Sequence, residues 1–296
     1  MSEFLQQLIN GISLGAIYAL IALGYTMVYG VLRFINFAHS DVLMIGAFIG
    51  FYAAPHFPKD SFAGGIGIML AAMAGCAALG IVIERLAYRP LRKASTLNVL
   101  ITAIGVSLFL ENGAQLLFSA KPQAFPPVFP SRVIHFGGLA VSTNQIAVLV
   151  ISILLLGILQ WIVLRTKIGT AMRAVSFNPA AASLVGVNND VVISFTFGLG
   201  SALAGAGGIL YALNYQAVEP YMGIMPGLKA FVAAVLGGIG NIPGAALGGL
   251  LIGIIEAFVG GSQFSGWRDA IAFAILILIL LVRPAGLLGK LQTEKV

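Results

Sequence analysis

Polar and ionisable side chains interrupt the apolar sequence of this chain at three places, INFAHSD, SLFLENGAQ and IGIIEAFVG. Ionisable groups inside a lipid bilayer are costly, so those that occur usually line the path of a substrate or ion. Hydrogen bonding between helices is one alternative explanation, and a proton relay is another. The residues that we assign to a translocation pathway on this basis are Asn36, His39, Asp41, Glu111, Asn112 and Glu256.

Catalysis, metal binding and nucleotide binding each need a pattern that this sequence lacks. The three histidines have no ligand spacing, and the single cysteine, Cys76, has no partner for an internal disulfide. The stretch GGIGNIPG has Pro243 where a dinucleotide fingerprint needs its third glycine, and it lacks the Gly-Lys-Ser/Thr of a Walker loop. We interpret it as a turn, and we expect no catalytic residue, no metal and no cofactor.

The composition indicates that the elements that position these side chains lie in a membrane. Hydrophobic residues make up 59% of the 296 residues and charged residues 9%, with a mean hydropathy of +1.01. A soluble domain carries about 25% charged residues, so this chain lacks the charge to cover a surface in water. The 37 glycines favour close helix contacts, because small residues four apart, such as Gly249 and Gly253, let helix backbones approach in lipid.

Apolar segments long enough to cross a membrane, about 20 residues each, occur along the whole chain. We predict spans at residues 5–29, 42–54, 64–83, 97–118, 146–164, 191–213 and 269–282. The region 228–260 is too long for one span and too short for two, so we expect two shorter helices around GGIGNIPG. The predicted fold class is an all-α integral membrane protein of about eight or nine transmembrane helices, with residues 1–296 as one domain.

The basic residues orient these spans, because cytoplasmic loops carry an excess of Lys and Arg. With the N-terminus outside, most of the 16 Lys and Arg residues fall in predicted inner loops or in the tail. We therefore predict an outer N-terminus, a cytoplasmic C-terminus and a cytoplasmic loop over residues 165–190. The net charge of +6 then reflects topology and does not indicate nucleic-acid binding.

The stretch NPAAASLVGVNND within this loop has the local signals of a short helix. Asn178 is a favoured N-cap, and Pro179 suits the first helical position. Alanines follow, and Gly186 can take the left-handed conformation that ends a helix. The predicted helix covers residues 179–185. It is too short to be stable alone and its alanine face is a poor membrane anchor, so a protein partner is favoured over a connector at the lipid interface.

The heptapeptide AAASLVG within this stretch resembles the E-A-A-x-x-x-G cytoplasmic signature of ABC importer permeases. Ala180 stands where the glutamate would be, which is similar to the form in the branched-chain amino acid permease branch, the LivH-like proteins. Further segments similar to that branch are GAIYALIALGYTMVYGVLRFINFAHSD, ERLAYRPLR, GGIGNIPGAALGG and VRPAGLLG.

The resemblance implies a permease subunit of a bacterial inner-membrane importer for branched-chain amino acids, with the all-helical fold of sugar and vitamin B12 importers. Such a permease pairs with a second related permease, two ATPase subunits that bind the ATP, and a periplasmic substrate-binding protein. The short helix is then the coupling helix that contacts an ATPase. The coupling residues implied are Arg173, Asn178, Pro179, Ala181, Ala182 and Gly186.

Other transport functions remain open at the level of sequence. A related permease for urea, short amides or other amino acids would share the same architecture. A proton- or ion-coupled secondary transporter would account for the intramembrane carboxylates and would carry its solute without ATP. A channel would pass solute only down its gradient.

Overall fold

The computed structural model describes residues 2–92, 94–136 and 138–289 of the chain. Its helices are α1 (Ser2–Leu32), α2 (His39–Ala53), α3 (Phe62–Ile83), α4 (Thr96–Phe118), α5 (Thr143–Arg165), α6 (Lys167–Phe177), α7 (Pro179–Leu184), α8 (Asn189–Tyr215), α9 (Ile224–Gly237), α10 (Ile242–Gly260) and α11 (Arg268–Val282). Strand β1 (Gln123–Ala124) pairs antiparallel with β4 (Ala217–Val218), and β2 (Val133–Phe136) with β3 (Leu139–Ser142). Each predicted span coincides with a helix, which confirms the all-α membrane fold class.

Helices α1 and α8 form the centre of the bundle. In the most apolar 18-residue stretch of each helix, 94% of the residues of α1 and 89% of those of α8 are buried within the chain. The corresponding share for the outer segment that contains α11 is 6%. Helix α10 lies directly on α1, since a Cβ added to Gly253 would come within 2.1 Å of the Gly15 nitrogen. One added to Gly249 would come within 2.4 Å of the Ala19 nitrogen. This pair of small residues four apart therefore serves close helix contact, as predicted.

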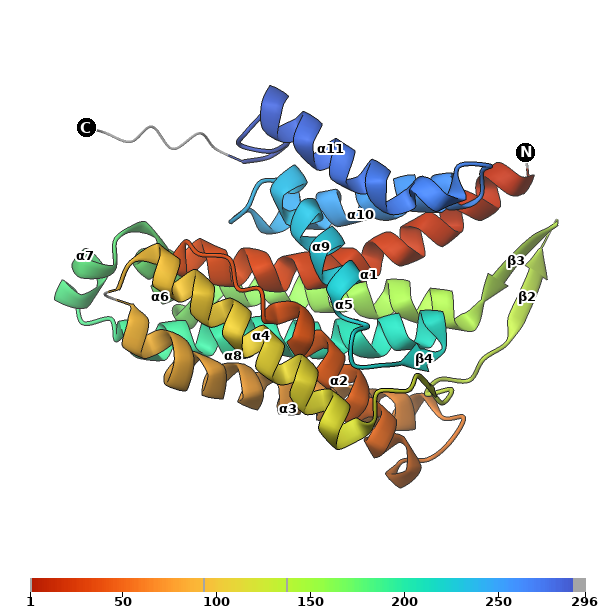
Figure 1. Ribbon diagram of the computed structural model, residues 1–296, viewed down its shortest axis with the longest axis horizontal. Coiled ribbons are helices and arrows are strands. Elements are labelled where there is room, and N and C mark those ends of the chain that lie inside the picture. Colours follow the sequence, from red (N-terminus) through yellow and green to blue (C-terminus); the bar gives the residue numbers. More distant parts are fainter. Residues whose placement is uncertain (1, 93, 137, 290–296) are drawn as a thin grey trace.

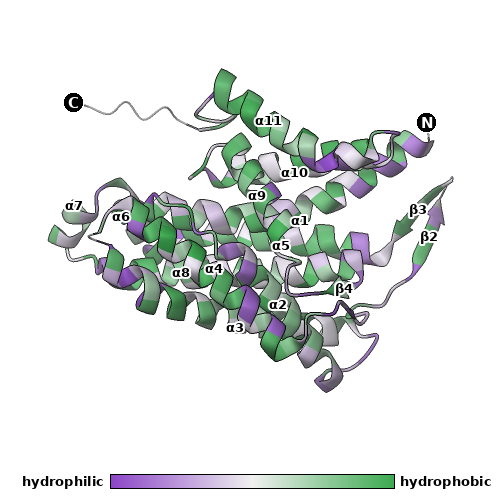
Figure 2. Ribbon diagram, viewed as in Figure 1, coloured by the Kyte–Doolittle hydropathy of each residue, from purple (hydrophilic) through white to green (hydrophobic). Residues whose placement is uncertain are grey.

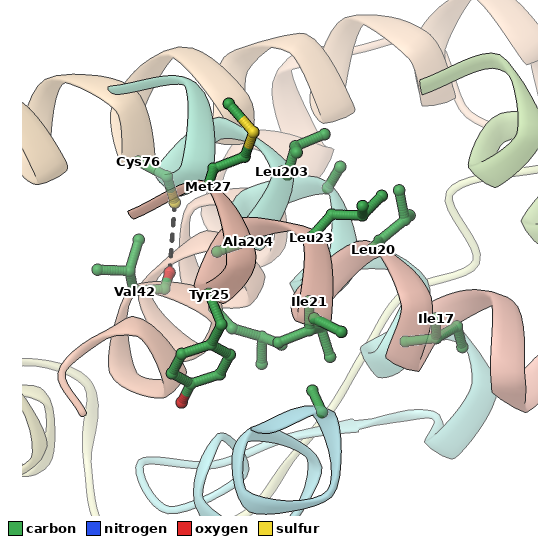
Figure 3. Packing of buried hydrophobic residues seen from close by; sticks show 14 of the residues in the cluster. Ile17, Leu20, Ile21, Leu23, Tyr25, Met27, Val42, Cys76, Leu203 and Ala204 are labelled. Atoms are coloured by element: carbon green, nitrogen blue, oxygen red, sulfur yellow. Dashed lines mark hydrogen bonds between the residues drawn. The ribbon is translucent and has the colours of Figure 1, made fainter. Parts of the chain in front are cut away.

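From Gly15 to Val28, every residue of α1 is buried by neighbouring helices. Ile17 and Ile21 are fully buried, and Figure 3 shows them in a continuous apolar cluster that includes Leu203 of α8. The thiol of Cys76 on α3 donates to the carbonyl oxygen of Val42 on α2, with Sγ and O 3.3 Å apart. A helix that is apolar all round belongs in the interior of a membrane bundle, and α1 meets that condition.

The outer helices are largely hydrophobic in sequence (Figure 2), and many of their large apolar side chains are exposed. Phe109 on α4 is 75% exposed and Leu281 on α11 is 80% exposed. Within the described part of the chain, seven helices are long and apolar enough to cross a membrane, α1, α4, α5, α8 and α10 together with the extended segments around α3 and α11. The turn at GGIGNIPG is confirmed, but of the two helices around it only α9 is short, with 14 residues against 19 for α10.

Helices α2 and α9 begin inside the bundle rather than at its surface. After Leu32 the chain turns back through Arg33, whose φ of 55° lies in the left-handed region. His39, the first residue of α2, lies against Gly24 of α1, about 12 Å before the end of that helix at 1.5 Å per residue. Gly223, directly before α9, lies against the backbone of Ser40. The first turns of both short helices therefore meet within the membrane region.

The two ends of the bundle differ in structure (Figure 1). The hairpin of β2 and β3 and the start of α1 lie at one end, and α6 and α7 lie at the other. Gln6 of α1 holds the hairpin by two hydrogen bonds to the backbone of Ala140, both 2.9 Å long. The start of α1 and residues 165–190 therefore lie at opposite ends of the bundle. The hairpin and helix α6 have no counterpart in the sequence-based prediction.

Candidate functional site

The predicted short helix is present as α7, and its capping residues act as expected. The side-chain oxygen of Asn178 accepts a hydrogen bond from the Ala181 nitrogen at 3.0 Å, and Pro179 occupies the first helical position. Gly186 follows with a φ of +88°, a backbone conformation that glycine adopts more readily than residues with a side chain. The helix ends at Leu184, one residue earlier than predicted, because Val185 serves as its C-cap.

The surface around α7 is apolar because of three large side chains rather than its alanines: Phe177 at the end of α6, Leu184 in α7 and the C-cap Val185. Phe177, Leu184 and Val185 are 89%, 88% and 79% exposed, whereas Ala182 is only 3% exposed and faces the rest of the chain. Large apolar side chains so exposed in a loop between spans indicate a surface that a partner covers. None of Phe177, Leu184 and Val185 was among the predicted coupling residues. For Phe177 the available signal was an aromatic side chain directly before the N-cap Asn178.

Arg173, the remaining predicted coupling residue, lies on α6 and not on α7. Its guanidinium donates to the carbonyl oxygen of Val163 near the end of α5 and to the hydroxyl of Thr170. It also lines a cavity of about 920 Å³ together with Arg33. Arg173 therefore fastens α6 to α5, while Asn178, Pro179 and Gly186 shape the ends of α7.

Helix α7 is tied to the start of α8. The side-chain amide of Asn189 donates to the carbonyl oxygen of Pro179 at 2.8 Å, and the Val187 nitrogen donates to the carbonyl oxygen of Ala182 at 3.0 Å. Asp190, the next residue of α8, pairs with Arg89 and with Arg92. The sequence-based assignment had included none of these contacts.

The polar residues around the start of α2 are buried together. Asn36, His39 and Asp41 are 5%, 1% and 1% exposed. Asp41 accepts a hydrogen bond from Ser107 of α4 at 2.5 Å, and Glu111, one turn further along α4, lies close to Asp41. The structure thus brings Asp41 and Glu111 together, from residues that are far apart in the sequence.

Two further groups complete this polar region. The ring of His39 packs against Tyr25 of α1, with centroids 4.6 Å apart, and Asn36 accepts a hydrogen bond from the hydroxyl of Tyr88 at 2.6 Å. Asn112, by contrast, is exposed on α4 and donates to the carbonyl oxygen of Leu108 at 2.7 Å. Asn112 is therefore not part of the buried group around Asp41.

Glu256 belongs to a different cluster. Its two carboxylate oxygens accept from the hydroxyl of Tyr18 at 2.8 Å and from the ammonium of Lys229 at 2.6 Å. Lys229 also pairs with Asp269 at 2.7 Å. Tyr18 lies near Glu256 and Tyr25 near Asp41, and these tyrosines are two turns apart on α1, about 10 Å. Glu256 therefore bridges helices at a level of the bundle other than that of Asp41.

The chain is similar in sequence to known proteins over almost its whole length. Residues 7–280 match the family model described as "Branched-chain amino acid transport system / permease component". The high-affinity branched-chain amino acid transport system permease protein BraD of Pseudomonas aeruginosa is 43% identical, over 99% of this chain and 98% of that protein. The permease protein LivH of Escherichia coli K12 is 41% identical over the same shares. Among solved structures, PsaBC from Streptococcus pneumoniae in complex with Fab covers 96% of this chain and is itself covered over 91%, with a TM-score of 0.47 and 12% identity.

Proposed function

The chain belongs to the family of permease components of branched-chain amino acid transport systems, and we propose that it forms half of the translocation pathway of an ATP-driven importer for leucine, isoleucine and valine. It is a multi-pass inner-membrane transport subunit, and ATP hydrolysis belongs to partner subunits rather than to this chain. The proposed partners are a second related permease, two ATPase subunits and a periplasmic substrate-binding protein.

The exposed apolar surface of α7 is the observation that carries this assignment. A helix of six residues is too short to persist alone in water, and the side chains of Phe177, Leu184 and Val185 have no cover in the described residues. A groove on an ATPase subunit fits such a surface, because short helices commonly place their apolar side chains in a groove of the partner. The coupling surface then consists of these three side chains, with Asn178 and Gly186 fixing the two ends of the helix.

The orientation follows from the same assignment. ATPase subunits act in the cytoplasm, so the end of the bundle with α7 faces the cytoplasm, and the end with the β2–β3 hairpin faces the periplasm (Figure 1). The excess of Lys and Arg in the loops at the α7 end supports this orientation. The hairpin end is then the end that receives substrate from the binding protein.

The polar group around Asp41 is the proposed lining of the pathway. The first turns of α2 and α9 meet there inside the membrane region, and broken helices are the usual way to build a substrate site at that depth. Ser107 and Glu111 carry this polar region onto α4, whose outer side bears the exposed Phe109 and Leu116. A second permease placed against α4 would enclose the pathway between the two subunits.

Reconstitution tests the proposal directly. The chain is purified with its partner permease and ATPases and placed in proteoliposomes with the binding protein outside. We expect uptake of leucine, isoleucine and valine that depends on ATP inside the vesicle. Gradient-driven uptake by the chain alone would instead identify a secondary transporter or a channel. Strong competition by urea, short amides or other amino acids would move the substrate assignment to another small solute.

A further inference from the structure

We infer that residues 84–92, the segment ERLAYRPLR, transmit movement of α7 to the start of α2 inside the membrane, with Arg92 at the end of the segment and Tyr88 at its middle as positioning residues. The inference rests on the proposed function, because it concerns how the coupling helix acts on the pathway. We call residues 84–92 the linker segment; it consists of a π-helical turn, Glu84–Tyr88, followed by a 3₁₀ turn, Arg89–Leu91. π-Helical turns are rare and are frequently found at functional sites.

The first step joins α7 to α8. Asn189 and Val187 bond the backbone of α7, and Ala182 is packed against the chain. Because α7 is held by its own backbone, a force applied to its exposed side chains moves the first turn of α8 with it. The connection between them, residues 185–188, is too short to absorb such a movement independently.

The second step joins α8 to the linker segment through Arg92, beside the ion pair that Arg89 makes with Asp190. The guanidinium of Arg92 contacts Asp190 with one terminal nitrogen, at 2.5 Å, and Glu84 with the other. A planar fork can hold two carboxylates in this way, whereas the point charge of a lysine cannot hold both in the same geometry. Arg92 therefore fixes the distance between the start of α8 and the beginning of the linker segment.

Glu84 makes this connection rigid. Its side chain has no exposure to solvent, and besides Arg92 it accepts a hydrogen bond from the hydroxyl of Ser194 at 2.5 Å. Asp190 and Ser194 are one turn apart on α8, so the linker segment is held at two points on the same helix face. A buried carboxylate is tolerated only with such partners, which leaves it little freedom to change them.

The third step joins the linker segment to the membrane interior. Tyr88 is 1% exposed and donates its hydroxyl proton to the side-chain oxygen of Asn36. Its ring is fixed between Phe34 and Phe197, with centroids 5.3 and 5.4 Å away. Asn36 precedes α2 by three residues, so its position determines where the polar region around Asp41 begins. Contacts are thus continuous from α7 to the proposed pathway.

A continuous set of contacts amounts to coupling only if removing one contact lowers the amount of substrate taken up per ATP hydrolysed. The mildest such change is Tyr88→Phe, which removes the hydroxyl and keeps the ring that packs between Phe34 and Phe197. In the reconstituted importer we expect unchanged binding of the ATPases and unchanged ATP hydrolysis. The leucine taken up per ATP hydrolysed should fall about fivefold, the ratio that corresponds to one hydrogen bond of ordinary strength. An unchanged ratio would overturn the inference.

A second set of variants tests the Arg92 end without leaving a charge buried alone. Arg92→Gln combined with Glu84→Gln removes both charges at once, and we expect a drop in uptake per ATP at least as large as that of Tyr88→Phe. Arg92→Lys keeps the charge but loses the fork, and it should lower the ratio in the same direction. The matched control is Arg85→Ala, because Arg85 is exposed on the same π-helical turn as Glu84 and has no ion pair or hydrogen bond within the described residues.

Amide hydrogen exchange separates failure of this inference from failure of the proposed function. Exchange at residues 33–38 is followed in the complex with and without bound ATP. We expect ATP to change that exchange in the wild type and not in Tyr88→Phe. A wild type that responds in exchange but takes up no leucine would refute the proposed function and leave the link intact. Equal responses in the wild type and Tyr88→Phe would refute the link, whatever the uptake.

Discussion

Two clusters in this molecule each place a cation between one buried and one partly exposed carboxylate, and they differ in the partners that surround the cation. Near the α7 end of the bundle, Arg92 joins Glu84, which has no exposure, to Asp190, which is 44% exposed and also pairs with Arg89. Lys229, itself 7% exposed against 20% for Arg92, joins Glu256 at 5% to Asp269 at 51%, with no second cation within the described residues. The first connects segments that must move if α7 is a coupling helix, whereas the second connects α9, α10 and α11.

The difference shows what each environment demands of an ion pair. At the α7 end, Arg89 remains paired with Asp190 and Ser194 remains bonded to Glu84 when Arg92 is changed, so the geometry of the Arg92 fork matters more than its net charge. Around Glu256, loss of Lys229 leaves the buried carboxylate with the hydroxyl of Tyr18 and no second cation within the described residues. We therefore expect substitutions at Arg92 to alter transport, and substitutions at Lys229 to alter stability.

The largest expected effect is that of Lys229→Met. It leaves Glu256 buried with only the hydroxyl of Tyr18 as a partner, and removing one member of a buried ion pair costs about 3–5 kcal/mol. Unfolding of the purified chain in detergent measures the loss. The control is Lys229→Met combined with Glu256→Gln, which should regain most of the stability. Equal stability of the single variant and the wild type would show that Glu256 does not depend on Lys229.

The next effect concerns the exposed surface of α7. Leu184→Ala should weaken binding of the ATPase subunits by about 30-fold, as expected for an apolar anchor worth about 2 kcal/mol. The matched control is Leu154→Ala on α5, a leucine that is also exposed, at 58% against 88%. Binding is measured by titration of labelled ATPase against the permease in nanodiscs. Equal losses for both leucines would show that α7 is not the docking surface.

A smaller effect is expected from Gly186→Ala. A Cβ at this position meets no atom within 4 Å, so the change acts only through the left-handed backbone, at about 1 kcal/mol. ATPase affinity should fall about fivefold. Gly157→Ala on α5 is the control, since its Cβ also meets nothing within 4 Å and a helical backbone accepts alanine. Similar results for the two variants would remove the argument that the end of α7 must be fixed.

The sequence was sufficient wherever the determining residues are neighbours in the chain. The caps of α7 are an example, since Asn178, Pro179 and Gly186 act within a few residues of one another. The contacts between buried polar groups could not be predicted from the sequence, because Asn36 and Tyr88 are 52 positions apart and Tyr18 and Glu256 are 238 apart. Which buried polar groups meet depends on how the helices pack, and apolar composition alone leaves that packing undetermined.

The smallest expected effect distinguishes the Lys229 cluster from the linker segment that contains Arg92 and Tyr88. Tyr18→Phe and Tyr88→Phe each delete one buried hydroxyl, the first bonded to Glu256 and the second to Asn36. Tyr18→Phe should lower the free energy of unfolding by about 1 kcal/mol and leave leucine uptake per ATP unchanged, because Glu256 keeps Lys229 as its partner. Tyr88→Phe should lower uptake per ATP. If Tyr18→Phe lowered uptake per ATP instead, Glu256 would belong with Asp41 in the pathway, and the division between a stabilising and a transmitting cluster would be wrong.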